Sequence, residues 1–155
     1  MKEFIISIDA GTTSNRSILF DLRGKPVFSS QKEFTQYFPK SGWVEHNPEE
    51  IWRTTVKTLK DVIQKAKRLN GKILTIGITN QRETTVLWDK KTGKPVYNAI
   101  VWQDRRQEDY CKNLRKQNKE NMIFNKTGLL IDSYFSGTKI KWILDNIPKA
   151  KQLMN

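Results

Sequence analysis

A short polar segment near the start of the chain has the residue types of a phosphate-binding turn. Residues 9–16 (DAGTTSNR) join two apolar runs, 4–8 and 17–20, so the segment is predicted to turn between two strands. Gly11 lets a ligand approach the backbone, and backbone N–H groups, hydroxyls and a guanidinium can hold phosphate. Asp9 can hold Mg²⁺, which then meets the phosphate. The alternative is an ordinary hairpin, because short motifs often match by chance.

A second candidate site follows the apolar run 73–78, which is predicted to be a central strand covered on both faces. Open α/β sheets bind ligands just beyond the carboxyl ends of such strands. Arg82 and Glu83 stand at that place, where they offer donors and an acceptor to a polyhydroxylated ligand. The alternative is a solvated, salt-bridged turn.

The elements that must position these residues begin with three antiparallel strands, the third at about 27–34. Asn47 as N-cap, Pro48 at N1 and Glu50 closing a capping box predict a helix that ends at 70–71. The 3.6-residue period of its apolar residues predicts a helix buried on one face. That stripe consists of Ile51, Thr55, Leu59, Val62, Ala66 and Leu69.

The second half of the chain is predicted to continue with strands at 85–88 and 96–102, joined by a turn at 89–94. Asp104 is predicted to cap a helix over 105–116, and Asn118 a short helix that ends before Gly128. A last helix over 136–146 ends at Pro148. It is expected to direct Ile140, Ile143, Leu144 and Ile147 inward, with Trp142 in the core.

Composition limits the class of protein. The 155 residues suffice for one domain with a core, and 37% hydrophobic residues favour a folded chain. No signal-peptide pattern or membrane-length apolar run is present, and the single Cys111 fits a reducing compartment, so a cytoplasmic location is expected. With His46 as the only histidine, a zinc site or a Ser/His/Asp triad is not expected. The net charge of +12 is scattered without an aromatic-interleaved patch, so nucleic acid is not an expected partner.

Five segments together resemble the glycerol kinases, in the FGGY family of carbohydrate kinases with the actin-like ATPase fold: 9–16, 42–46, 77–84, 98–103 and 128–139. The resemblance implies an α/β fold, namely a partial actin-like ATPase (ribonuclease H-like) domain with a mixed sheet, and implies ATP and Mg²⁺ as cofactors. It assigns the ATP phosphates to Thr12, Thr13, Ser14 and Arg16, and the metal to Asp9. Glycerol is assigned to Arg82, Glu83, Trp102 and Tyr134, where indole covers its C–H face.

Two departures from the family accompany this resemblance. Ala10 replaces a glutamine that is common in the family, and the chain is much shorter than the family's proteins. Residues 1–155 are therefore interpreted as the N-terminal part of the first carbohydrate-kinase domain, without the second domain. The catalytic base is expected beyond residue 155, and the chain alone is expected to be inactive. The alternatives are a kinase of another polyol or sugar, a non-catalytic remnant, and half of a split kinase completed by a separate chain.

Overall fold

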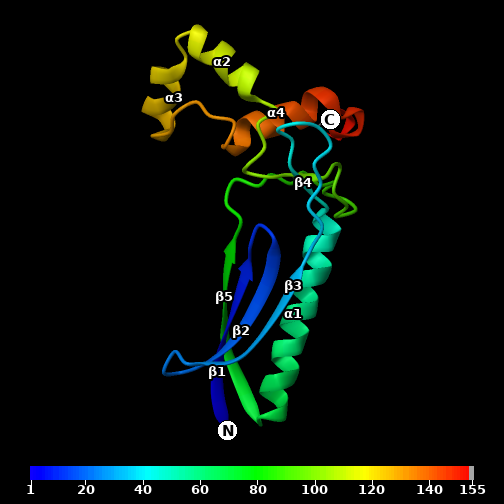
Figure 1. The fold of residues 1–155 in the computed structure, drawn as a ribbon, viewed down its shortest axis with the longest axis vertical. Coiled ribbons are helices and arrows are strands. Elements are labelled where there is room, and N and C mark those ends of the chain that lie inside the picture. Colours follow the sequence, from blue (N-terminus) through cyan, green and yellow to red (C-terminus); the bar gives the residue numbers. More distant parts are fainter. Residues whose placement is uncertain (154–155) are drawn as a thin grey trace. The chain divides into compact units, whose positions relative to one another are not determined.

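The computed structural model describes residues 1–153, which form two compact units (Figure 1). The first unit consists of Met1–Gln36 and Asn47–Gln81. The second consists of Tyr37–His46 and the described residues from Arg82 onward. Each unit is described by itself below.

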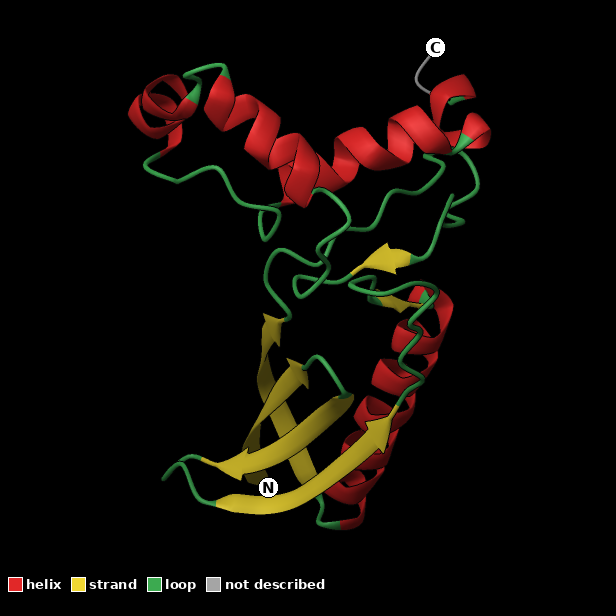
Figure 2. Ribbon diagram, turned by 45° about the horizontal axis from the view of Figure 1, so that its top comes forward, coloured by secondary structure: helices red, strands yellow, loops and turns green. Residues whose placement is uncertain are grey.

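The first unit is built on a four-stranded mixed sheet in the order β3-β2-β1-β5 (Figure 2). Strands β1 (Lys2–Ala10), β2 (Ser14–Asp21) and β3 (Pro26–Glu33) are antiparallel neighbours, which confirms the three leading strands. Strand β5 (Gly71–Asn80) pairs with β1 in parallel. The α/β class and the mixed sheet predicted from the sequence are therefore confirmed.

Helix α1 (Pro48–Arg68) lies in the unit's second chain segment, directly before β5, and covers one face of the sheet. The Asn47 side chain accepts a hydrogen bond from the Glu49 N–H, so the predicted N-cap is confirmed. Glu50, predicted to close a capping box, accepts a hydrogen bond from the Thr35 hydroxyl at 3.2 Å. Lys65, Lys67 and Arg68 in the last turn complement the helix dipole.

The core of this unit lies between α1 and the sheet. Alternate residues of β1 point toward the helix, as a strand's period of two requires. Two parts of the α1 face differ in chemistry, because Val62 and Ala66 are apolar whereas Thr54 and Thr58 are polar. The buried cluster comprises Phe4, Ile6, Ile8, Leu19, Val62 and Ala66.

The prediction that β5 is a central strand covered on both faces is wrong. β5 is an edge strand of the described sheet. Ile76 and Ile78 pair in register with the buried Ile6 and Ile8, yet they are 44% and 73% exposed. An apolar run of strand length indicates a strand, but it does not reveal how many neighbours the strand has.

The second unit contains a small two-stranded sheet of β4 (Glu45–His46) and β6 (Ala99–Ile100). The strands predicted at 85–88 and 96–102 are much shorter than expected. They are reduced to β6 and to isolated bridges that join Thr85 to Ile100 and Trp88 to Pro95. His46 is fully buried, as expected for a structural histidine.

Four helices complete the second unit: α2 (Glu108–Lys116), α3 (Glu120–Thr127), α4 (Ser136–Asn146) and α5 (Pro148–Gln152). Two predicted caps are wrong, since α2 begins after Gln107 rather than at Asp104, and α3 begins after Lys119 while Asn118 adopts a positive φ of 56°. Gly128 ends α3 in the left-handed conformation, as expected. Pro148 follows the end of α4 but also begins α5.

Between residues 1 and 153, no helix is long and apolar enough to cross a membrane.

Candidate functional site

The predicted phosphate-binding turn is the hairpin between β1 and β2. The Gly11 N–H donates to the Ser14 carbonyl at 3.0 Å, which closes the turn. A Cβ on residue 11 would lie only 3.0 Å from that carbonyl oxygen, so the tight turn favours glycine. The carbonyl of Thr12 accepts from Gln36 and that of Thr13 from Phe34, so the tip is held to the segment that follows β3.

Strand alternation divides the polar residues of this hairpin between two faces of the sheet. Asn15 and Ser17 are buried against α1, where Asn15 donates to Thr54 at 2.6 Å and Ser17 contacts Thr58 at 2.9 Å. Ser14 and Arg16 therefore lie on the opposite face. Gln31 links them there, because it accepts from the Arg16 guanidinium and donates to the Ser14 hydroxyl, each at 2.9 Å.

Asp9 is exposed at the end of β1 and pairs in register with Arg16, so it lies on the same face as Ser14 and Arg16. Among residues 1–153, no group of three or more His, Cys, Asp and Glu side chains could hold a metal ion. Mg²⁺ is often held by one or two carboxylates together with the phosphates of its nucleotide. A single carboxylate beside a hydroxyl-rich turn fits that mode of binding.

In the second unit, Glu83 is held at the N-terminus of α4. Its Oε2 accepts from the Ser136 N–H at 3.0 Å and from the Ser136 hydroxyl at 2.7 Å. A carboxylate at this position interacts favourably with the helix dipole and satisfies a backbone donor. The φ of Glu83 is 63°, which a residue other than glycine rarely adopts. The carboxylate is thus fixed although its backbone is strained.

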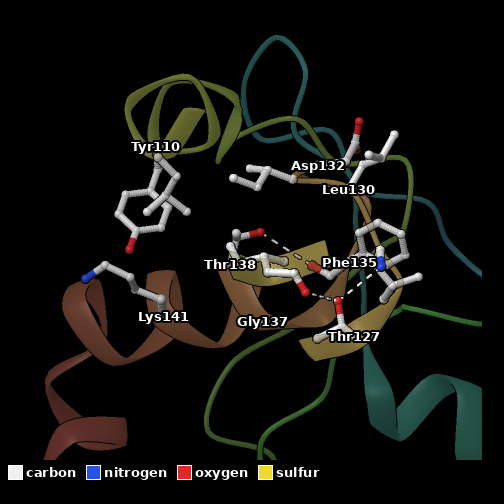
Figure 3. A pocket seen from close by; sticks show the side chains of 12 residues that line it. Tyr110, Thr127, Leu130, Asp132, Phe135, Gly137, Thr138 and Lys141 are labelled. Atoms are coloured by element: carbon white, nitrogen blue, oxygen red, sulfur yellow. Dashed lines mark hydrogen bonds between the residues drawn. The ribbon is translucent and has the colours of Figure 1, made fainter. Parts of the chain in front are cut away.

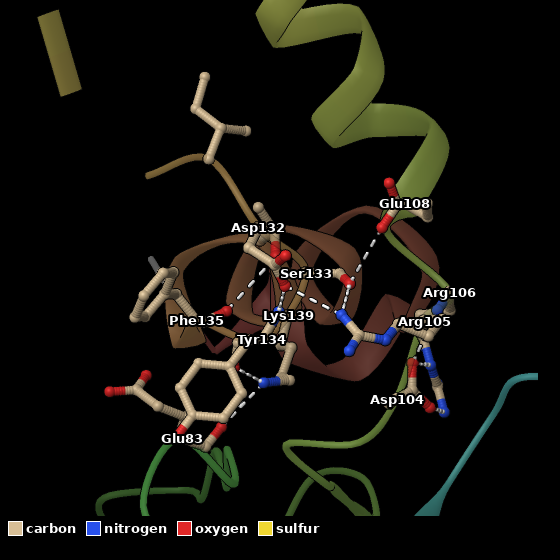
Figure 4. A network of polar contacts seen from close by, with 12 residues as sticks. Glu83, Asp104, Arg105, Arg106, Glu108, Asp132, Ser133, Tyr134, Phe135 and Lys139 are labelled. Atoms are coloured by element: carbon tan, nitrogen blue, oxygen red, sulfur yellow. Dashed lines mark hydrogen bonds and ion pairs between the residues drawn. The ribbon is translucent and has the colours of Figure 1, made fainter. Parts of the chain in front are cut away.

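Shared contacts place Tyr134 and Trp102 close to Glu83. The buried ammonium of Lys139 donates to the backbone carbonyls of both Glu83 and Tyr134, as Figure 4 shows. The Trp102 and Tyr134 rings meet edge to face, with centroids 6.0 Å apart. The structure therefore brings together three of the four residues assigned to glycerol, although 51 positions separate Glu83 from Tyr134.

Hydrogen bonds also connect the segment around Trp102 to the segment that follows Glu83. The Trp102 N–H donates to the Thr84 hydroxyl at 3.3 Å, and Thr85 and Ile100 exchange two backbone hydrogen bonds of 2.9 and 3.0 Å. The fourth assigned residue, Arg82, precedes Glu83 directly and its side chain is exposed. The sequence around 82–85 therefore carries both a solvent-facing cation and a fixed carboxylate.

A buried ionic network supports the segment that carries Trp102. The Arg106 guanidinium bonds Glu45 and Asp104 at 2.8 Å, and each of these side chains is at most 3% exposed. The guanidinium also lies 3.9 Å from the centroid of the Trp43 ring and 4.4 Å from that of Trp142. Trp142, predicted to be a core residue, thus packs against a cation.

Hydrogen bonds within this network favour the charged forms of Glu45 and Arg106. Burial opposes the charge of Glu45, but hydrogen bonds from Tyr97, Arg106 and Asn98 outweigh it, so the pKa of Glu45 is lowered. Burial likewise opposes the charge of Arg106, whose hydrogen bonds to Asp104 and Glu45 raise its pKa. Both shifts favour the ion pair between Glu45 and Arg106.

A separate cavity of about 370 Å³ opens between α2, α3 and α4 (Figure 3). Its lining is mostly apolar and includes Leu114, Ile123, Leu130 and Phe135. None of the residues that the sequence assigned to phosphate or glycerol lines this cavity. An apolar lining does not satisfy three hydroxyls, so the cavity does not suit glycerol.

The sequence analysis missed Ser136 and Lys139, the two α4 residues that hold Glu83. The predicted inward face of α4 included Ile140, which is 37% exposed, whereas Lys139 and Ile143 are buried one turn apart. One signal was available, because Lys139 precedes Ile143 by four positions and so shares its face. A lysine on a helix surface is normally interpreted as solvated, so this pattern alone does not predict that Lys139 is buried.

Comparisons with known proteins identify the family to which the chain belongs. The profile of the FGGY family of carbohydrate kinases, N-terminal domain, matches residues 4–155. Glycerol kinases of Malacoplasma penetrans and Petrotoga mobilis are 60% and 57% identical over 97% and 98% of the chain. The structure of Plasmodium falciparum glycerol kinase with ADP matches at a TM-score of 0.91 and 38% identity, over 97% of this chain and 30% of that one. The chain likewise spans 30% of the length of the two curated relatives.

Proposed function

This chain belongs to the FGGY family of carbohydrate kinases, and on that premise we propose that it supplies glycerol and phosphate contacts for ATP-dependent glycerol phosphorylation. The products of that reaction are glycerol 3-phosphate and ADP. The observation that carries the proposal is the grouping of Glu83, Tyr134 and Trp102 through Ser136 and Lys139. An ATP-dependent reaction also agrees with the cytoplasmic location expected from the single cysteine.

The chemistry of the three side chains suits a small triol. Both hydrogen bonds from Ser136 to the Glu83 carboxylate go to Oε2, and Oε1 can accept a hydrogen bond from a glycerol hydroxyl. The Tyr134 hydroxyl can donate or accept, and the Trp102 indole offers an apolar face to the C–H groups. Arg82 supplies donors from the adjacent position.

The nucleotide is proposed to bind through the hairpin of the first unit. Its phosphates would contact the Thr12 and Thr13 tip together with Ser14 and Arg16, and Asp9 would hold Mg²⁺. When bound, the metal neutralises phosphate charge during transfer. Residues of this chain would orient the phosphates, whereas no residue in it is assigned to the catalytic base.

We therefore expect the 155-residue chain to bind glycerol without turnover. General-base catalysis typically contributes a factor of about 10²–10⁴, and positioning of both substrates contributes more. A coupled ADP assay with glycerol and Mg-ATP tests this expectation, and turnover comparable to that of ordinary kinases would contradict it. The alternative of a separate chain that completes the enzyme is tested by adding the portion of a relative that this chain does not span. Restored turnover would support that alternative.

Glycerol binding itself is tested by NMR titration of the isotope-labelled chain. We expect the indole signal of Trp102 and the backbone signals of Glu83 and Tyr134 to move with glycerol. The Glu83→Gln variant should weaken binding at least several-fold, because a carboxylate acceptor is replaced by an amide. Glu120→Gln, a change of the same kind in the first turn of α3, should leave the affinity unchanged.

The choice of substrate is tested in the same titration. Glycerol should bind more tightly than a pentulose or a hexonate, and tighter binding of either would identify another carbohydrate as the substrate. Trp102→Phe should weaken glycerol binding, whereas Trp88→Phe, at a tryptophan that is 64% exposed, should not. If no carbohydrate moves the Trp102 signal, the proposed site is wrong.

A further inference from the structure

Lys139 is a buried lysine whose polar contacts converge on the candidate site. Its side chain lies in the first turns of α4, and the residue is 1% exposed. The ammonium donates to the Glu83 carbonyl at 3.0 Å and to the Tyr134 carbonyl, and lies 5.8 Å from the Tyr134 ring centroid. Figure 4 shows the ammonium reaching toward Glu83 and Tyr134.

Burying an ammonium is costly, so this contact needs a reason beyond packing. Desolvation lowers the pKa of Lys139 to about 8. The charged groups that face it act in both directions: Glu83, Asp104 and Asp132 raise the pKa, whereas Arg105 lowers it. If this position only needed packing, an uncharged side chain would fill the space without the cost of burying a charge.

The same helix turn holds Glu83 at two points. Ser136 binds its carboxylate, and Lys139, three positions later, binds its backbone carbonyl. Glu83 has a φ of 63°, a conformation that persists only when its surroundings fix it. Because the ammonium also binds the Tyr134 carbonyl, one group sets the position of both residues.

We propose that Lys139 is a positioning residue that holds Glu83 and Tyr134 in the arrangement that binds glycerol. The inference rests on the proposed function, since it names a further residue of the same site. The hydrogen bonds of Lys139 in this site go to the backbone carbonyls of Glu83 and Tyr134, so it acts through these two residues rather than on the substrate.

A pH dependence follows from this geometry. A charged ammonium gives stronger hydrogen bonds to carbonyls than a neutral amine does. As the pH rises through about 8, the contacts of Lys139 weaken and Glu83 is held less firmly. Glycerol affinity should therefore be full below pH 7 and fall several-fold by pH 9.5.

The experiment measures glycerol affinity of the 155-residue chain by NMR between pH 6.5 and 9.5. Lys139→Met should bind several-fold more weakly at pH 7 and show no pH dependence near 8. Lys139→Arg, which stays charged throughout, should bind without the loss at high pH. Lys141→Met, on the same helix but with its side chain 44% exposed, is the matched control and should follow the wild type.

A second measurement without glycerol separates the two proposals. Carbon-detected NMR reads the carbonyl carbons of Glu83 and Tyr134, which should titrate together near pH 8 in the wild type and not in Lys139→Met. If glycerol binds but these carbons do not titrate, or if Lys139→Arg keeps the wild-type pH dependence, the inference is overturned. If the carbons titrate but glycerol binds at no pH, the proposed function is overturned, whereas the hold on Glu83 is supported. Should Lys139→Met fail to fold, Lys139→Arg decides the question alone.

Discussion

Replacing Arg106 by leucine tests whether the buried ionic network is essential to the second unit. The substitution removes the guanidinium from between Glu45 and Asp104 and leaves two carboxylates buried without their cation. It also removes the cation from the faces of Trp43 and Trp142. Neighbouring Arg105 offers a matched control, because its ion pair with Asp132 has a similar length of 2.9 Å but is about half exposed.

The expected magnitudes differ clearly between these two arginines. Removing one partner of a buried ion pair costs about 3–5 kcal/mol, and each desolvated cation–π contact adds up to about 2 kcal/mol. An exposed pair contributes about 0–1 kcal/mol. Arg106→Leu should therefore cost about 4 kcal/mol or more, a large part of the roughly 5–15 kcal/mol that stabilises a domain. Arg105→Leu should cost less than about 1 kcal/mol.

The difference should also depend on pH. The pKa of Glu45 is lowered in the folded protein, so its contribution to stability is present above its ordinary value and is lost as the pH falls through the folded value. Without Arg106, burial raises the pKa of Glu45, and protonation relieves part of the penalty in acid. The free-energy difference between wild type and Arg106→Leu should thus be largest at pH 7 and shrink toward pH 4.

Urea unfolding followed by tryptophan fluorescence measures these changes, since Trp43 and Trp142 report directly on the network. With a slope of about 1–3 kcal/mol per molar urea, Arg106→Leu should lower the midpoint by roughly 2 M. If the Arg106 and Arg105 variants lose equal stability, the buried network contributes no more than a surface ion pair and the reasoning fails.

Three further outcomes are expected from the same unfolding assay and from sedimentation. The folded-state pKa of Lys139 is lowered from 10.5 to about 8, so the unfolded chain binds more protons than the folded chain between these pH values. The free energy of unfolding of the wild type should therefore rise relative to that of Lys139→Met by about 2 kcal/mol from pH 7 to 9.5. A Cβ at residue 71 would lie 2.2 Å from the Phe4 ring, so Gly71→Ala should destabilise the chain by about 1–3 kcal/mol, although alanine lowers the entropy of the unfolded state. Gly77→Ala is the control and should not destabilise, because a Cβ there meets no atom within 4 Å. Ile78→Lys should reduce self-association at high concentration, because it places a charge on an exposed apolar edge strand; unchanged sedimentation would show that the edge is not adhesive.

Local signals explain why the first unit could be largely predicted from the sequence. The hairpin between β1 and β2 follows from alternation and a glycine turn, and α1 follows from an N-cap and an amphipathic period. What could not be predicted was the polar part of the α1 face. Thr54 and Thr58 contact Asn15 and Ser17 of β2, and that pairing joins residues 39 and 41 positions apart.

The second unit was harder to predict because few of its contacts are local. The apolar segments at 85–88 and 96–102 are typical of strands, yet only the two-residue strand β6 and isolated bridges form there. Asp104 looked like a helix cap from its position before 105–116. Its carboxylate instead binds the Val44 N–H at 2.7 Å and the Arg106 guanidinium, and those partners lie on segments 60 and 2 positions away.

Glu83 shows why a site residue can be named from its sequence while the groups that hold it cannot. Its position after a strand and beside Arg82 was enough to suggest a polar ligand. Its placement, however, involves a backbone conformation with a φ of 63°, which no neighbouring residue type requires. That conformation is held by Ser136 and Lys139, 53 and 56 positions later. The buried ammonium and the strained backbone both cost free energy, and the contacts of Glu83 with Ser136 and Lys139 offset that cost only while both form. A change in either α4 residue should therefore alter glycerol binding although neither is assigned to glycerol.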